Sequence, residues 1–301
     1  MPWLIFALSG PVLWAVSTHI DKYLVERYFR RGSIAVLLVF TALMGFLFLP
    51  AIRLYQPVAV PSLPDLLTIA GAGVLYMGAM FFYLQALRSE EASVIAVYFQ
   101  ATPLFGYALG YLVLGETLSS RQMLGGSLIV ASVALLSYGG RRRTVRFNAR
   151  TSALMLGCAL SSAVSSVAFK LFAIQDEFWT TTFWTYFGEA AVGAVILSIG
   201  RYRREFLAVL RASPVGLLAT NGANEAINLA GGVAARYALL LAPLGLVQAV
   251  TSTTALFVFV FGAALSALTP ALARDELSAR ALLQKGACVT LAAIGAILAG
   301  G

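Results

Sequence analysis

Long apolar stretches separated by short polar links make up nearly the whole chain. A bilayer core about 30 Å thick needs about 20 mostly apolar residues per helix, and ten stretches approach or exceed that length. They are residues 3–20, 34–52, 66–87, 92–114, 122–139, 152–173, 179–199, 214–236, 243–268 and 281–300. The pattern predicts an all-α, polytopic integral membrane protein with ten transmembrane helices. The first stretch has no basic region ahead of it, so we expect a retained span and not a signal peptide.

The eighth stretch carries a regular set of polar side chains. Asn221, Asn224, Glu225 and Asn228 are spaced i, i+3, i+4 and i+7, so they share one helix face, which Arg236 continues. An ionisable group at bilayer depth costs about 2.5–3.5 kcal/mol, so this face is expected to line the protein interior or a watery cavity. Eleven residues span about 16 Å of helix, so Glu225 and Arg236 must bond other partners.

Other stretches offer further candidates for a solute path. Glu189 follows Thr182, Thr185 and Tyr186 at the same spacing, which places a second carboxylate on a hydroxyl-bearing face. The remaining candidate substrate-binding residues are Trp14, Thr18, Tyr76, Tyr83, Gln100, Tyr186, Gln248 and Ser252. Aromatic faces and amide groups can together hold an amphipathic metabolite, and a carboxylate beside ring faces suits a cation.

Each candidate also has a plainer, structural interpretation. Hydroxyl groups commonly bond a carbonyl of their own helix, and Asn side chains hold neighbouring membrane helices together. Glu225 and Glu189 are the candidates for proton coupling, but either could be a hydrogen-bonded packing group. Asp21 is expected to reach headgroups or to pair with Lys22, and Glu116 to cap a helix or anchor it at the interface.

Composition excludes several other classes of protein. Apolar residues make up 60% of the chain and charged residues 11%, and mean hydropathy is +0.85, which excludes a soluble domain. Cys158 and Cys288 fall within apolar stretches, and no metal site or cofactor is indicated. The net charge of +8 resides in short links between stretches, so we expect contact with membrane lipid and none with nucleic acid.

The chain also repeats itself. The segment AVSTHIDK at 15–22 resembles AVSSVAFK at 163–170, and TLSSR at 117–121 resembles ELSAR at 276–280. These matches predict a first five-helix repeat over 1–140, a basic linker over 141–150 and a second repeat over 151–301. Five is an odd number, so the second repeat enters the membrane in the opposite sense, as in secondary transporters with a substrate site between inverted repeats.

With these features the sequence resembles the EamA-type transporters of the drug/metabolite transporter superfamily. The resemblance is carried by Gly10 and Trp14, by EASVIAVYFQATPLF at 91–105, and by LGETLSSRQMLGGSLIVASVALL at 114–136. It implies a ten-helix bundle that moves metabolites, often outward. The second half departs from the pattern, because Ala255 stands where the first half has Pro103.

Charges in the links indicate an orientation. Links after odd-numbered stretches hold 17 Lys and Arg residues, among them Arg201, Arg203, Arg204 and Arg211 in the link after the seventh, whereas the other side holds four. The positive-inside rule then places both termini outside the cytoplasm, most simply in a bacterial inner membrane. The resemblance implies cytoplasmic termini instead, and we follow the charge count for this chain.

The leading hypothesis is a secondary transporter that moves a small polar or amphipathic metabolite, an amino acid or an amine, by alternating access. We expect export, a monomer or homodimer, and no enzyme activity. No ATP-binding GxxxxGK[ST] segment is present. The alternatives are a translocase of a lipid-linked substrate, an intramembrane enzyme built on Ser166 and Lys170, and a scaffold that transports nothing.

Overall fold

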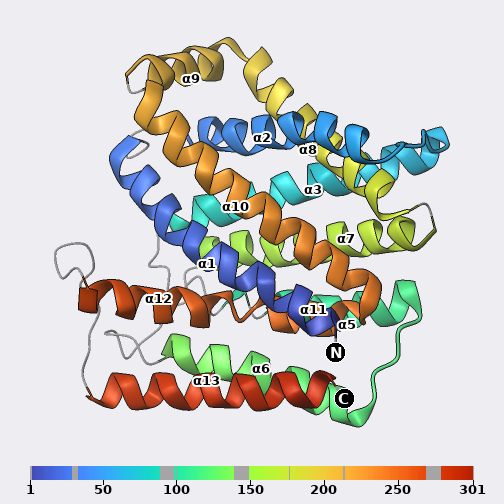
Figure 1. The fold of residues 1–301 in the computed structure, drawn as a ribbon, viewed down its shortest axis with the longest axis vertical. Helices are drawn as coiled ribbons and strands as arrows, with labels where there is room; N and C mark the ends of the chain where they lie inside the picture. Colours follow the sequence, from blue (N-terminus) through green and yellow to red (C-terminus); the bar gives the residue numbers. More distant parts are fainter. Residues whose placement is uncertain are drawn as a thin grey trace.

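The structure, a computed structural model, describes residues 2–28, 33–88, 98–99, 101–138, 149–175, 177–212, 214–268 and 279–300 (Figure 1). The helices of the first half are α1 (Pro2–Tyr28), α2 (Ile34–Tyr55), α3 (Leu63–Leu87), α5 (Ala101–Leu114) and α6 (Ser120–Tyr138). Those of the second half are α7 (Ala149–Gln175), α8 (Phe178–Ser198), α9 (Gly200–Ala212), α10 (Pro214–Leu241), α11 (Leu244–Thr251), α12 (Thr254–Leu268) and α13 (Ala279–Gly300). The described residues contain no strand, so the all-α prediction is confirmed.

Five helical stretches in the described part of the chain are long and apolar enough to cross a bilayer. They are Pro2–Asp21, Ile34–Tyr55, Leu63–Ala86, Ala149–Ile174 and Leu244–Gly262, and the bent pair α8 and α9 makes a sixth if it counts as one span. The predicted membrane character is therefore confirmed, whereas ten crossings remain a prediction. Residues 92–97 of the predicted fourth span, Gln100 and most of the predicted linker, 141–148, lie outside the described residues.

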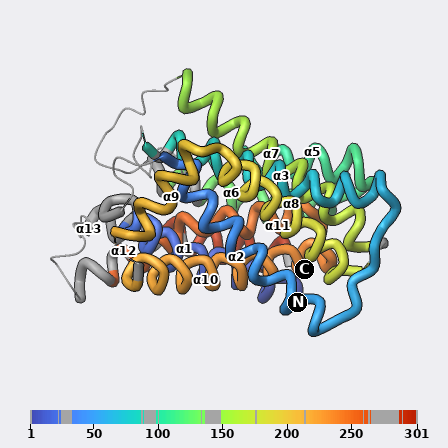
Figure 2. Tube along the Cα trace, turned by 90° about the horizontal axis from the view of Figure 1, so that it is seen from above, coloured from blue at the N-terminus to red at the C-terminus, as the bar shows by residue number. Residues whose placement is uncertain are grey.

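Helices of the two halves pack mainly against each other. α1 packs on α10, α3 on α7, α2 on α8, α6 on α13 and α5 on α11. Figure 1 shows α6 and α13 side by side along one edge of the molecule, with α1 and α10 crossing its centre. The two ends of the chain lie close together at one end of the bundle (Figure 2). The polar faces of the central helices are thus buried between the halves.

Glycine permits a close crossing of α3 with α8. A Cβ atom on Gly73 of α3 would lie 2.0 Å from the backbone oxygen of Thr185, and one on Gly188 of α8 would lie 2.0 Å from that of Ala70. Only hydrogen fits at both positions, as is common where membrane helices approach closely. The crossing brings α3 and α8 together beside Glu189.

The predicted ninth span is broken into α11 and α12 at residues 252–253. Four consecutive hydroxyl groups each donate to the carbonyl three residues earlier: Thr251 Oγ1 at 3.0 Å, Ser252 Oγ at 2.7 Å, Thr253 Oγ1 at 2.6 Å and Thr254 Oγ1 at 2.7 Å. Such side-chain bonds compete with the helical ladder, which explains the break.

The chain turns by 97° between α8 and α9. Ile199, at the junction, has an extended backbone conformation and ends α8. The sequence indicated only a basic link here, whereas the structure forms a 13-residue helix with a buried apolar side chain at Phe206.

An ion pair joins the halves at the end of the bundle where the chain begins and ends. Glu116, in the link between α5 and α6, lies 2.5 Å from Lys170 Nζ of α7. Glu116 also accepts a 2.7 Å hydrogen bond from the backbone nitrogen of Leu244, and Lys170 donates a 2.6 Å bond to the carbonyl of Ala242. Glu116 therefore caps α11, and the pair holds the link between α10 and α11.

Candidate functional site

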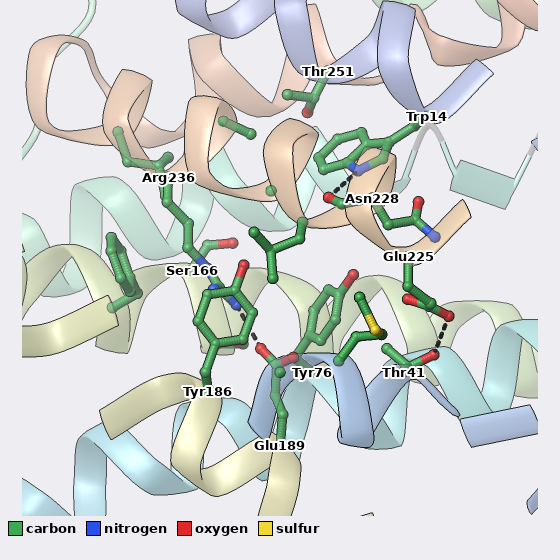
Figure 3. A pocket seen from close by; sticks show the side chains of 18 of the residues that line it. Trp14, Thr41, Tyr76, Ser166, Tyr186, Glu189, Glu225, Asn228, Arg236 and Thr251 are labelled. Atoms are coloured by element: carbon green, nitrogen blue, oxygen red, sulfur yellow. Dashed lines mark hydrogen bonds and ion pairs between the residues drawn. The ribbon is translucent and has the colours of Figure 1, made fainter. Parts of the chain in front are cut away.

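A cavity lies between the two halves, with walls from α1, α2, α3, α7, α8, α10 and α11 (Figure 3). It offers about 140 Å³ to the centres of water-sized molecules. One water needs only about 10–15 Å³ by this measure, so the cavity has room for a water cluster or a small solute.

Helix α10 supplies the polar wall of the cavity. Glu225, Asn228, Gly232 and Arg236 follow one another at intervals of three or four residues and all line the space. Gly232 leaves room between the two charged positions, because it has no side chain. The polar face of α10 thus lines an interior space and is turned away from lipid.

The carboxyl group of Glu225 is held by its neighbours in the absence of a counter-ion. Thr41 Oγ1 of α2 donates a 2.9 Å hydrogen bond to Glu225 Oε1, and the side chain is 5% exposed. Among the described residues no cationic nitrogen lies within 4 Å of it. Trp14 Nε1 donates a 3.4 Å bond to the backbone oxygen of Asn228, so α1 closes the wall beside this group (Figure 3).

The second carboxylate, Glu189 of α8, is paired with Arg236. Arg236 Nη2 lies 2.6 Å from Glu189 Oε1, and the Glu189 side chain is 2% exposed. The guanidinium carbon also lies 4.4 Å from the ring centre of Tyr186, 5.5 Å from that of Phe169 and 5.9 Å from that of Tyr76. Arg236 Nη1 is buried and has no hydrogen-bond partner in the described residues. One N–H pair of Arg236 thus remains available to an acceptor.

A short polar chain runs from this region towards the far end of α1. Ser17 Oγ donates to Asn224 Oδ1 at 2.7 Å, and Asn224 Nδ2 donates to Asp21 Oδ1 at 2.6 Å. Asp21 was expected to reach headgroups or to pair with Lys22. It bonds α10, because the crossing of α1 and α10 brings its carboxylate against Asn224, and the side chain of Lys22 lies outside the described part of the chain.

The structure collects most of the predicted site residues at one place. Trp14, Tyr76, Tyr186, Glu189, Glu225, Asn228, Arg236 and Gln248 line the cavity. Thr18, Tyr83, Asn221, Asn224 and Ser252 lie outside its lining, and Gln100 is outside the described residues. The Thr18 and Ser252 hydroxyls bond carbonyls of their own helices, and Tyr83 packs 5.3 Å from Phe99 between ring centres.

Two important wall residues were not among the predicted site residues. Thr41 is the only polar side chain between Ile34 and Pro50, and that isolation was a signal for an interior partner. Phe169 carried no such signal, because an aromatic residue in an apolar helix is ordinary packing. Its place against the Arg236 guanidinium depends on the contact between α7 and α10.

Cofactor binding finds no particular support in the geometry of this site. Within the described residues, no group of three His, Cys, Asp or Glu side chains lies close enough together to hold a metal ion. The chemistry that the cavity does offer is one unpaired carboxyl group, one guanidinium nitrogen and several ring faces.

Comparison with known proteins identifies the first half of the chain. Residues 1–138 match the EamA-like transporter family, which confirms the resemblance and supports membership of the drug/metabolite transporter superfamily. A solved crystal structure with 18% sequence identity has the same fold, with a TM-score of 0.67 over 99% of this chain and 97% of that one. A search of curated proteins found no match.

Proposed function

We propose, from the membership of the drug/metabolite transporter superfamily that residues 1–138 support, that this protein is a secondary transporter of a small polar or amphipathic metabolite. The solute is of the amino acid or amine type, and it binds in the cavity between the halves. The halves move against each other, so that the cavity opens to each side in turn. The direction that we propose is export.

The observation that carries this proposal is a pair of groups in one cavity that can each take a ligand, a carboxyl group without a cation and a guanidinium nitrogen without an acceptor. Glu225 has no cation within 4 Å in the described part of the chain, and Arg236 Nη1 has no acceptor there. A buried carboxyl group without a counter-ion and a buried guanidinium nitrogen without an acceptor are costly, so a solute that supplies a cation and an acceptor is favoured. An ammonium group suits Glu225, and a carboxylate or carbonyl oxygen suits Arg236.

Helix packing supports alternating access by two inverted five-helix repeats, 1–140 and 151–301. In such a repeat α1 corresponds to α7, and α3 corresponds to α10. The symmetry then requires that the contact between α1 and α10 has a counterpart between α7 and α3, and both contacts are present. α2 corresponds to α8 and α6 to α13, and each of these equivalent pairs is also in contact. The broken helix α11–α12 beside the cavity also fits, because transporters build substrate sites from discontinuous helices.

We further propose that both termini face away from the cytoplasm. The basic helix α9 lies at the opposite end of the bundle from the chain's two ends (Figure 1), and the positive-inside rule assigns its end to the cytoplasm. A reporter fused after Gly301 tests this, and a cytoplasmic signal would show that the orientation is wrong.

We propose Glu225, and not Glu189, as the group that would couple transport to protons. Glu189 already neutralises Arg236 at 2.6 Å, whereas Glu225 is bonded by a neutral hydroxyl group. A group that must take up and release a proton during each cycle needs this freedom from a fixed counter-ion.

Proteoliposomes loaded with radiolabelled amino acids or amines, with and without a pH gradient, test the proposal. We expect at least one such solute to be transported and Glu225→Gln to abolish its movement while the protein stays folded. Glu177→Gln is the matched control, because Glu177 is exposed in the link before α8 and makes no capping bond. Transport that survives Glu225→Gln unchanged would make Glu225 a packing group and remove the main support for the site.

A further inference from the structure

Helix α9 differs from every neighbouring helix in its distribution of charge. It follows the 97° bend after α8 and leads into α10. Four of its 13 residues are arginine, and one is acidic. These charges are divided between its two faces.

The inner face of α9 is bound to the start of α2. The Phe206 ring packs 5.0 Å from that of Phe40, measured between centres, and is buried. Glu205 accepts a hydrogen bond from the backbone nitrogen of Ser33, the residue that caps α2. The only acidic side chain of α9 therefore points towards α2, where it is hydrogen-bonded to Ser33.

The outer face of α9 is consequently cationic. Arg201, Arg203, Arg204 and Arg211 are all exposed, and within the described residues none has a carboxylate oxygen within 4 Å. Arg204 Nε donates to the Gly200 carbonyl, but the guanidinium group still reaches solvent. A face of four arginines with no carboxylate oxygen within 4 Å among the described residues attracts anions from outside this part of the chain.

The surroundings of this face indicate which anions these are. Exposed apolar side chains flank the arginines: Val195 of α8 is 63% exposed, Leu207 of α9 40%, and Val215 of α10 79%. Arginine beside exposed apolar side chains is typical of the level of the lipid headgroups, where the cation reaches phosphate and the apolar groups reach acyl chains.

We propose that the outer face of α9 binds the phosphate groups of acidic phospholipids. The planar, five-donor guanidinium group suits phosphate oxygens, and Leu207 and Val215 can contact the acyl chains of the same lipids. Because Phe206 and Glu205 attach α9 to α2, which carries Thr41 into the cavity, bound lipid also steadies one wall of the solute site. No residue of α9 lines the cavity, so lipid binding at its outer face does not depend on the proposed solute class.

The test compares the purified protein in nanodiscs of phosphatidylcholine alone and of phosphatidylcholine mixed with phosphatidylglycerol. We expect the mixed discs to raise the melting temperature by several degrees, since a ligand that binds only the folded form stabilises it. Arg203→Gln/Arg204→Gln should lose most of that rise, and Arg203→Lys/Arg204→Lys should keep part of it. The control is Arg53→Gln/Arg121→Gln, which removes two exposed arginines elsewhere and should keep the rise.

Three results would overturn the proposal. The first is an equal melting temperature of the wild-type protein in both kinds of disc. The second is a Gln double variant at 203 and 204 that keeps the full rise in mixed discs. The third is an equal rise from inorganic phosphate added to discs of phosphatidylcholine alone, because the face would then bind free anions and not lipid. Native mass spectrometry, which counts retained phosphatidylglycerol, checks occupancy independently of stability.

Discussion

The ion pair between Arg236 and Glu189 offers the most direct test of the cavity's geometry. Replacing Arg236 by Gln leaves the Glu189 carboxylate, 2% exposed, without the cation that now lies 2.6 Å away. Removing one partner of a buried pair costs about 3–5 kcal/mol, because the other charge stays buried without compensation. We expect Arg236→Gln to lower the free energy of unfolding by an amount of that order.

The double variant Arg236→Gln/Glu189→Gln isolates the pair itself. Two neutral amides leave no uncompensated charge, so the double variant should be less destabilised than the sum of the single variants. The lost stacking of Arg236 on Tyr186, 4.4 Å away, is common to the single and double variants and cancels in the cycle. We expect a coupling energy towards the upper end of about 0.5–3 kcal/mol.

Unfolding in mixed micelles with increasing SDS, followed by the loss of helical circular dichroism, measures these free energies. Arg53→Gln is the control, because Arg53 is exposed at the end of α2 and should cost little. The reasoning would be refuted if the single effects added within about 0.5 kcal/mol. It would also be refuted if Arg236→Gln were no more destabilising than Arg53→Gln.

Three further predictions follow from other contacts. Gly188→Ala should destabilise the protein, since its Cβ would lie 2.0 Å from a backbone oxygen of α3, whereas Gly222→Ala, with open space, should be neutral or stabilising in the same unfolding assay. Lys170→Met should lower the free energy of unfolding by about 3 kcal/mol or more, because Glu116 loses its cation, and the double variant with Glu116→Gln should recover part of that free energy. Thr41→Val should lower the free energy of unfolding by about 1–3 kcal/mol and weaken solute binding several-fold in proteoliposome uptake, because the buried Glu225 carboxyl group loses its 2.9 Å donor, and an unchanged KM would contradict this.

Helices and the polar face of α10 were predictable because both depend on local periodicity. A side chain every three or four residues lies on one helical face whatever the helix packs against. The same arithmetic showed that Glu225 and Arg236 must bond partners elsewhere, and each does, to Thr41 and Glu189. The prediction that the protein lies in a membrane followed from composition, because water solvates such an apolar chain poorly.

Local patterns did not distinguish the residues that line the cavity from residues that bond neighbouring helices. Tyr83 and Asn224 looked like cavity residues, but helix crossings turn Tyr83 towards Phe99 and Asn224 towards Asp21. The sequence of α9 indicated only a basic link, because its apolar face is short. Only the structure shows that this face packs on Phe40 of α2. A hydrophobic pattern predicts that a helix face is buried, but it does not identify the residues that cover that face.

The amino-acid sequence by itself determined which segments are helical, which of them are apolar enough to lie in the bilayer, and which side chains must face the protein interior. Tertiary structure alone decided which buried polar groups meet: Glu189 and Arg236 are 47 residues apart, and Thr41 and Glu225 are 184 apart. Pairing at such separations depends on crossings such as that of Gly73 with α8, where a single Cβ atom would hold the backbones apart. Periodicity acts over one helical turn, and packing acts over the whole molecule.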